Sequence, residues 1–291
     1  MTNLLVYHIA SGHAFFSGIG LILLALLLAR RAKGRSMALV GRISACVGLL
    51  LIAISSTPSP LWLDLVAGFV TVIWIGIEGS SRPSFHTPIL ALRWMVLVLW
   101  LVLACSELPY HFVPVLPRLR TPTVTIVGDS ISAGISDEAE TWPSLLAKRS
   151  GLVVHNLSVA SANVTTAKKQ ADRITELNSL TVVEIGGNDV LGGIAPETFE
   201  EGLNVLLSQL RSKSQTVVLL ELPLPPFHNQ YGAIQRKLAK RHGVILVPKR
   251  VLLSVLTSQG ATVDSLHLSK AGAETMAVAI GKILSSGGNL D

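Results

Sequence analysis

Four long apolar runs that precede residue 108 place the strongest constraint on what this chain can fold into. Each run is as long as the ~17–25 residues that a helix needs to cross a bilayer. Arg42 interrupts the first turns of the second run, but an arginine near a helix end can extend its charge to the interface. The runs predict a transmembrane region of four helices over residues 1–107, at Asn3–Ala29, Met37–Ser55, Leu61–Ile77 and Pro88–Cys105.

A cleaved signal peptide is the alternative for the first run. Such a peptide carries its positive charges before the apolar segment. Here the basic cluster follows the apolar segment instead. We therefore expect a membrane span.

The basic residues predict the orientation. They crowd the loop after the first run, and one more lies in the third loop, whereas the second loop (56–60) has none. Basic loops stay in the cytoplasm, so the N-terminus and, after four crossings, the C-terminal part are expected outside. The prediction is a multi-pass protein of the inner or plasma membrane with an extracytoplasmic (periplasmic) domain. The residues that carry it are Arg30, Arg31, Lys33, Arg35 and Arg82.

The charge balance separates the two parts of the chain. Up to Arg120 there are nine Lys or Arg residues against three acids, and from Thr121 onward there are fifteen of each sign. The net charge of +6 therefore belongs to the membrane region, and no basic face remains for nucleic acid. Cys46 and Cys105 both fall within apolar runs, so no disulfide is expected in the outer domain.

Three ionisable residues, His8, His13 and Asp64, fall within the apolar runs. Buried ionisable groups at this depth are costly, and they can mark a proton or ligand path. The predicted topology places all three near an outer end of their spans. We therefore favour an interfacial position that water can reach.

A proline-rich segment at 108–120 predicts a short, semi-rigid linker, and residues 121–291 are enough for one further domain. Branched apolar runs in this domain alternate with segments of helical character. This alternation predicts an α/β fold with a parallel sheet that is covered on both faces. The expected strands are Thr123–Val127, Leu152–Asn156, Leu180–Ile185, Thr216–Leu222 and Val244–Val247. The expected helices are Trp142–Arg149, Val164–Leu177, Pro196–Ser212, Tyr231–Arg241 and Ser269–Leu284.

Polar motifs follow the strands where ligands bind in such sheets. Gly128-Asp129-Ser130 ends the first strand, and on its own it is also an ordinary turn and helix cap. Gly186-Gly187-Asn188-Asp189 follows the third strand, and Asn188 offers an amide donor at the same edge.

The sequence "VDSLHLSKAG" supplies a base for the serine. Asp264 precedes His267 by three residues in one loop, so the carboxylate can hold the imidazole while its other nitrogen takes a proton. A serine needs such a base to become a nucleophile. The other histidines of the domain, His155, His228 and His242, are interpreted as structural or solvated.

In this order and spacing, GDS at 128–130, GGND at 186–189 and DxxH at 264–267 resemble the SGNH (GDSL) hydrolase family. The resemblance covers Thr121–Ser286, and it is strongest to the thioesterase I/lysophospholipase branch. It implies a flavodoxin-like three-layer α/β/α domain with a parallel five-stranded sheet. It also implies hydrolysis of esters or thioesters without metal or cofactor.

The resemblance also implies roles for single residues. Ser130 is expected to be the nucleophile, His267 the general base and Asp264 its partner. The oxyanion hole would be formed by Ser130, Ser161 and Asn188. Substrate contacts are expected from Asp129, Gly187, Asp189, Val190 and Leu191.

The chain departs from the family pattern at two positions. Ser161 stands where the family has a glycine that donates to the oxyanion, and Leu268 stands where a proline usually follows the histidine. A backbone N–H does not require glycine, so we expect Ser161 to serve. If φ there is positive, serine would be strained by about 1–3 kcal/mol.

We therefore predict a membrane-anchored serine esterase that acts on acyl esters such as lysophospholipids, thioesters or small esters. Removal or transfer of O-acetyl groups on envelope glycans is an alternative. A membrane sensor or scaffold with a vestigial hydrolase domain is another. The expected partners are the acyl-ester substrate and the lipid bilayer, and the sequence does not predict an oligomeric state.

Overall fold

The computed structural model describes residues 4–31, 35–78, 86–118, 121–135, 140–175, 179–264, 266–286 and 288, with the side chains of 86–88 left out. Contacts divide the chain into two compact units, which are described separately. One unit is helical and contains His8–His111 together with Pro225–Asn229. The other contains Met1–Tyr7, Phe112–Leu224 and Gln230–Asp291.

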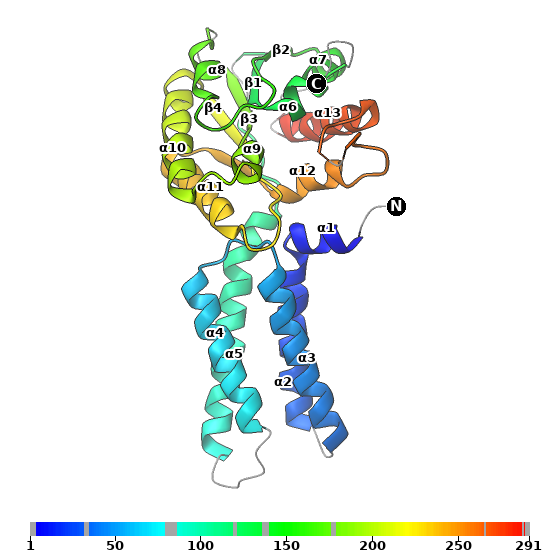
Figure 1. Cartoon of the computed structure of the whole chain (residues 1–291), viewed down its shortest axis with the longest axis vertical. Coiled ribbons are helices and arrows are strands. Elements are labelled where there is room, and N and C mark those ends of the chain that lie inside the picture. Colours follow the sequence, from blue (N-terminus) through cyan, green and yellow to red (C-terminus); the bar gives the residue numbers. More distant parts are fainter. Residues whose placement is uncertain are drawn as a thin grey trace. The chain divides into compact units, whose positions relative to one another are not determined.

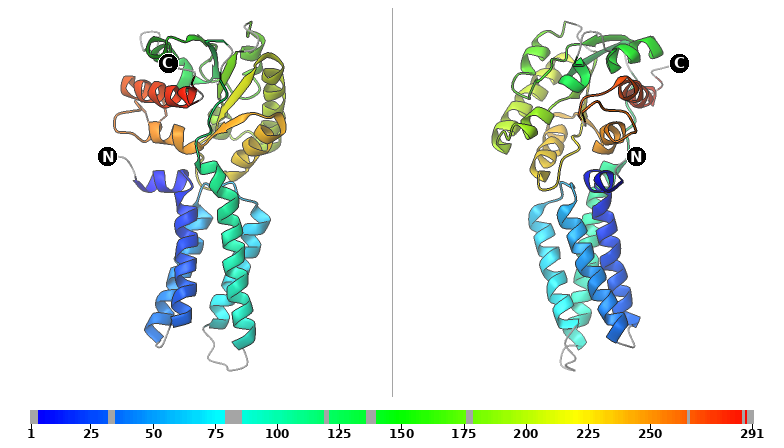
Figure 2. Two further views of the ribbon diagram at one scale, coloured as in Figure 1. Left: turned by 180° about the vertical axis from the view of Figure 1, so that it is seen from behind. Right: turned by 45° about the vertical axis from the view of Figure 1, so that its right-hand side comes forward.

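Four long helices lie side by side in the helical unit (Figures 1 and 2). They are α2 (His13–Arg31), α3 (Arg35–Ile54), α4 (Leu61–Glu78) and α5 (His86–Glu107). Each of the four gives a segment that is long and apolar enough to cross a membrane. The prediction of four such helices is confirmed.

The first predicted span, Asn3–Ala29, is wrong at its start. A separate helix, α1 (Leu4–Ala10), is followed by a turn at Gly12, whose φ of +87° lies in the left-handed region that favours glycine. The Ser11 hydroxyl oxygen then accepts the His13 N–H at 3.3 Å, where α2 begins. The apolar run is therefore broken by a turn, and Asn3 itself lies outside the described residues.

Close contact between two glycines sets the packing of α2 against α3. A Cβ on Gly18 would lie 2.5 Å from the carbonyl oxygen of Gly48, and a Cβ on Gly48 would lie 2.6 Å from that of Gly18. Small residues of this kind let helix backbones approach closely where no hydrophobic force drives them together.

The polar residues singled out in the apolar runs lie at helix ends. His13 begins α2 and stacks on His111, with ring centroids 5.8 Å apart, and Asp64 lies in the first turn of α4. These positions fit the expected interfacial placement. Lys33 and Arg82, which entered the orientation argument, lie outside the described residues.

The second unit is built on a five-stranded sheet in which every pair of neighbouring strands is parallel, in the order β2-β1-β3-β4-β5. This is the doubly wound order of flavodoxin-like folds, in which the chain changes direction between β1 and β3. Four of the five strands lie within the predicted segments, and β1 extends one residue beyond its predicted end at Val127. The strands are β1 (Thr123–Gly128), β2 (Val153–Asn156), β3 (Leu180–Glu184), β4 (Thr216–Leu220) and β5 (Ile245–Val247).

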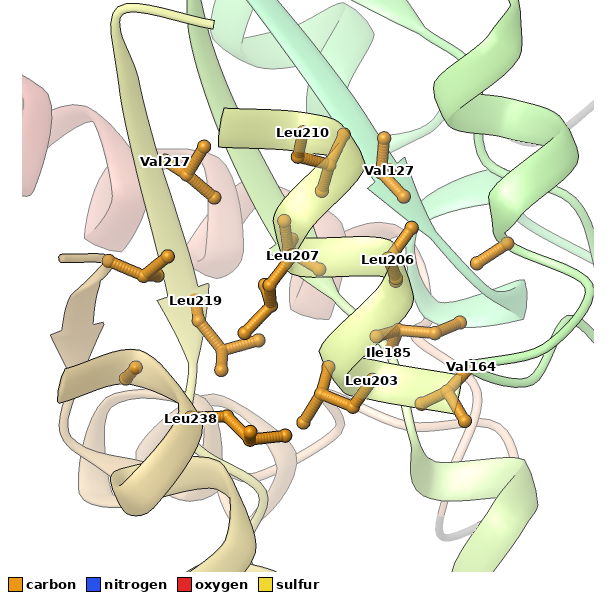
Figure 3. Close-up of a cluster of buried hydrophobic side chains, with 14 of the residues drawn as sticks. Val127, Val164, Ile185, Leu203, Leu206, Leu207, Leu210, Val217, Leu219 and Leu238 are labelled. Atoms are coloured by element: carbon orange, nitrogen blue, oxygen red, sulfur yellow. The ribbon is translucent and has the colours of Figure 1, made fainter. Parts of the chain in front are cut away.

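Alternate strand residues build two separate cores, one on each face of the sheet. Val217 and Leu219 of β4 join the core drawn in Figure 3, whereas Val218 and Leu220 join the opposite one. The first core is covered by α8 (Lys168–Asp172), α10 (Pro196–Lys213) and α11 (Asn229–His242). The second is covered by α7 (Trp142–Ser150), α12 (Lys249–Leu256) and α13 (Lys270–Ser285). The expected α/β/α layers are confirmed.

Two helical predictions need correction. The helix expected at Val164–Leu177 is a series of turns followed by the five-residue α8, because Asn163 and Thr166 form hydrogen bonds that stabilise a local turn. Leu177 lies outside the described residues. Inside the predicted linker, Leu108–His111 form a 3-10 helix. Three helices were not predicted: α6 (Ser130–Ala133), α9 (Gly187–Leu191) and α12.

Candidate active site

The end of β1 delivers Ser130 to the sheet edge at the switch point between β1 and β3. Gly128 must be glycine there, because a Cβ would lie 2.8 Å from the backbone carbonyl oxygen of Glu184 on β3. Asp129 caps α6, and its carboxylate accepts the Ile131 N–H at 3.0 Å. Ser130 is thus the first residue of a helix, where N–H groups have no acceptor within the helix.

A chain of hydrogen bonds joins Ser130 to the loop that precedes α13. The Ser130 Oγ lies 3.0 Å from Nε2 of His267, and the Nδ1 of the same ring lies 2.6 Å from Oδ2 of Asp264. The other oxygen of Asp264 accepts the backbone N–H groups of His267 and Leu266, at 2.8 and 3.1 Å. Both ring nitrogens of His267 therefore have a hydrogen-bond partner.

These hydrogen bonds further favour the charged form of Asp264, a side chain that is exposed to water. The bond from the His267 ring is the largest cause, and the two backbone N–H groups add to it. Together they lower the pKa of Asp264 to about 2. A carboxylate that is ionised at every physiological pH can orient an imidazole and stabilise its protonated form.

Backbone hydrogen bonds join the two ends of the loop that carries Asp264 and His267. Val263 donates its N–H to the carbonyl oxygen of His267 at 2.9 Å, and Ser269 donates to that of Ala261 at 2.9 Å. Ser269 also caps α13 by accepting the N–H of Gly272. Leu268, where the resembled family has proline, forms a β-bridge with Thr262. Backbone pairing thus fixes the loop that carries His267.

Besides Ser130, the residues expected at the oxyanion hole are Ser161, which lies after β2, and Asn188, which lies after β3. Ser161 has a φ of +61°, so the strain foreseen for a serine at a positive φ applies here. Within the described part of the chain, its N–H has no hydrogen-bond acceptor. The Asn188 amide donates to the carbonyl oxygen of Ala162 at 2.8 Å and, more weakly, to Asp129 at 3.4 Å.

The side chains of two of the five predicted substrate contacts are buried. Asp129 is 3% exposed and serves the α6 cap, and Asp189 is 1% exposed and accepts the Val164 N–H at 3.1 Å. Burial is the main cause that raises the pKa of Asp189 to about 6. Both side chains hold loops in place. Gly187 and Val190 are half-buried, and Leu191 is 66% exposed.

Sequence reasoning missed the polar residues beneath the nucleophile turn. Gln170 of α8 pairs with both the N–H and the C=O of Gly128, each at 2.9 Å. Glu184 accepts the Ser132 hydroxyl at 2.9 Å, and Ser132 accepts the Trp142 indole N–H at 3.1 Å. A lone acid in the apolar strand "LTVVEIGG" was the signal for Glu184. No signal marked Gln170.

A pocket of about 290 Å³ opens beside Ser130 and His267. Its apolar lining includes Ile131, Ile135 and Trp142. Among the described residues, no group of three or more His, Cys, Asp or Glu could hold a metal ion.

The α/β unit is similar in sequence and fold to known proteins. Residues 126–275 match the GDSL-like Lipase/Acylhydrolase family. The sequence is 32% identical over 143 residues to Esterase TesA of Pseudomonas aeruginosa, a match that covers 43% of this chain and 69% of that protein. It is 28% identical over 173 residues to thioesterase 1/protease 1/lysophospholipase L1 of Escherichia coli (strain K12), covering 55% of this chain and 83% of that protein.

Among solved structures, the crystal structure of TesA superposes with a TM-score of 0.50 at 28% identity. It covers 56% of this chain and 97% of the other. Fold and sequence therefore define the α/β unit as a carboxylic ester hydrolase. The chain belongs to the GDSL-like lipase/acylhydrolase family, and its four apolar helices lie outside the matched region.

Proposed function

We propose that this protein is a membrane-anchored serine esterase in which Ser130, His267 and Asp264 form the catalytic triad. The observation that carries the proposal is the continuous hydrogen-bond chain from Ser130 Oγ through His267 to Asp264, at 3.0 and 2.6 Å. A serine hydroxyl becomes a nucleophile when an oriented base lies within hydrogen-bond reach.

The proposed reaction is acyl transfer in two steps. Ser130 Oγ attacks the ester carbonyl carbon while His267 Nε2 takes the hydroxyl proton, and Asp264 stabilises the imidazolium. The imidazolium then protonates the leaving alkoxide or thiolate, which departs and leaves an acyl-serine. Water, deprotonated by the same imidazole, releases the acid and regenerates Ser130.

The negative oxygen of the tetrahedral intermediate would be held by three donors. Two are the backbone N–H groups of Ser130 and Ser161, and the third is the Asn188 amide. The Asn188 hydrogen that points at Asp129 over 3.4 Å makes a weak bond, so Asp129 can orient the amide while the same hydrogen is shared with the oxyanion. Loss of one such donor lowers kcat by about 10²–10³-fold.

The proposed substrates are lipid or small acyl esters. Support comes from the apolar pocket lining and from the exposed Leu191 beside Asn188. The similar Escherichia coli protein bears the name of a thioesterase and lysophospholipase. The proposed anchor is the set of four apolar helices. The basic residues at the end of α2 favour a cytoplasmic end there, and hence an extracytoplasmic hydrolase domain.

The triad is tested on the full-length protein in detergent with p-nitrophenyl esters. Ser130→Ala and His267→Ala should each lower kcat by at least about 10³-fold while the melting temperature stays unchanged. Ser144→Ala, which removes an exposed hydroxyl on α7, is the matched control and should retain full activity. If Ser130→Ala keeps more than a few per cent of the rate, Ser130 is not the nucleophile.

Two further measurements test the substrate and the orientation. A panel of acetyl, butyryl, octanoyl and palmitoyl esters, with lysophosphatidylcholine, should show higher kcat/KM for acyl chains longer than acetyl. Activity restricted to acetyl esters and acetylated glycans would favour the O-acetyl alternative. Alkaline phosphatase fused after Asp291 should be active, and activity only of a cytoplasmic reporter would reverse the orientation.

A further inference from the structure

Glu184 is a carboxyl group buried beneath the nucleophile turn. It is the last residue of β3, it pairs with Gly128 in the sheet register, and it is 1% exposed. Its Oε2 accepts the Ser132 hydroxyl at 2.9 Å. Its Oε1 is fully buried and has no donor among the described residues. An ionised carboxylate in such a place would carry an uncompensated charge.

Asp129 is the neighbouring carboxyl group, because Glu184 pairs in the sheet register with Gly128, which directly precedes Asp129. The two carboxyl groups interact with each other. Asp129 is also buried, but it accepts N–H groups from Ile131 and from the Asn188 amide. Two adjacent buried carboxylates cannot both be ionised, so they share a proton.

The donors around each group indicate where the proton resides. Asp129 receives the Ile131 N–H at 3.0 Å and the Asn188 amide at 3.4 Å, and both favour its charged form. Glu184 receives the Ser132 hydroxyl and the Asp129 N–H, but its Oε1 is buried with no hydrogen-bond partner among the described residues. Burial, and then the charge of Asp129, raise the pKa of Glu184 well above its ordinary value. A proton on Oε1 also gives that oxygen the partner that it otherwise lacks.

We propose that Glu184 is protonated and donates a hydrogen bond from Oε1 to the Asp129 carboxylate, and that this bond positions the turn of Ser130 and the amide of Asn188. The inference rests on the proposed roles of Ser130 and Asn188. Asp129 is the shared element, because its two oxygens accept the Ile131 N–H after the nucleophile and the Asn188 amide. Glu184 is a positioning residue that touches no substrate.

Other groups around the pair bear on a pH measurement. On the Glu184 side lie Ser132 and, behind it, the Trp142 indole, neither of which titrates near neutrality. On the Asp129 side, His267 and Asp189 act through their charges. The pH profile of kcat should therefore keep its shape when Glu184 is replaced by a neutral group of equal geometry.

Glu184→Gln and Glu184→Leu in the full-length protein test this proposal. Glutamine is isosteric with a protonated glutamate, since its N–H₂ donates to Asp129 and its oxygen accepts from Ser132. We expect Glu184→Gln to keep kcat within threefold of the wild type with an unchanged pH profile. Glu184→Leu should lower kcat at least tenfold with little change in KM. A glutamine variant as impaired as the leucine variant, or a leucine variant with full kcat, would overturn the proposal.

A second measurement does not depend on activity. The infrared difference spectrum of wild type minus Glu184→Gln should contain a carboxylic acid C=O band at pH 7. A carboxylate band in its place would contradict the proposal even if Glu184→Leu fails to fold. Failure of the proposed triad would appear separately, as activity that survives in Ser130→Ala, and it would leave the infrared band unchanged.

Discussion

The helical unit and the α/β unit treat apolar side chains in opposite ways. In α4, Trp62 and Phe69 are each 67% exposed, whereas Phe199 in the α/β unit is completely buried. Exposed apolar area costs about 25 cal/mol per Å² in water, so a surface like that of α4 is unfavourable in water. One chain thus carries surfaces suited to two solvents, which is the physical basis of the proposed anchor.

The largest expected effect contrasts the same residue type in the two units. Phe199→Ala empties a fully packed site in the core of Figure 3 and should lower the free energy of unfolding by about 3–5 kcal/mol. Phe69→Ala removes a side chain that touches little protein, and it should leave the melting temperature of the detergent-solubilised protein nearly unchanged. Equal losses of stability in Phe199→Ala and Phe69→Ala would contradict the contrast between the two units.

A charge introduced at an exposed position tests directly whether that position faces lipid or water. Phe69→Asp, near the middle of α4, should reduce membrane insertion by about 2.5–3.5 kcal/mol if this face meets lipid. Val205→Asp, on the exposed face of α10, should change stability by no more than about 0.5 kcal/mol. The fraction of protein that resists carbonate extraction from membranes measures the first effect. Full integration of Phe69→Asp would argue against a lipid-facing surface.

The close contact of α2 and α3 predicts a smaller effect. Gly48→Ala places a Cβ 2.6 Å from a backbone oxygen, so the helices must separate, at a cost of about 1–3 kcal/mol. Gly68→Ala on α4 is the control, because a Cβ there meets nothing within 4 Å. Thermal unfolding in detergent should show a loss for Gly48→Ala alone. Tolerance of both changes would contradict the packing of α2 on α3.

The smallest effect is a change in pH dependence within the α/β unit. The pKa of Asp189 is raised to about 6, so between roughly pH 4 and 6 the folded state binds more protons than the unfolded state. Stability from this group is therefore present at low pH and is lost as the pH rises through that window. Asp189→Asn should flatten the curve of unfolding free energy against pH there. An unchanged slope would contradict the raised pKa.

Most of the fold could be predicted from the sequence, because the helical unit and the α/β unit each have a clear pattern of apolar residues. The four apolar segments and the five strands were located within a few residues, since long apolar runs and branched strands have few alternatives. The prediction from sequence failed where a local turn determines the conformation of the backbone. Gly12 splits the first apolar run, and the turn held by Asn163 and Thr166 replaces the first part of a predicted helix.

The site was predicted to the extent that its residues follow strand ends. The spacing of Asp264 and His267 was enough to pair them, because one short loop carries both. The burial of Asp129 and Asp189 was not predicted, because sequence position does not reveal whether a side chain points inward. Gln170 reaches Gly128 across 42 positions of the chain, a contact that only the fold creates.

Labelling of the full-length protein in its native membrane with a fluorophosphonate probe tests the central assignment most directly. The probe should phosphonylate Ser130 alone, as read by mass spectrometry of the labelled peptide. The adduct should be absent in Ser130→Ala and form far more slowly in His267→Ala. A folded, ester-hydrolysing protein that carries no adduct, or carries it on another serine, would contradict the convergence of Ser130, His267 and Asp264 as the catalytic machinery.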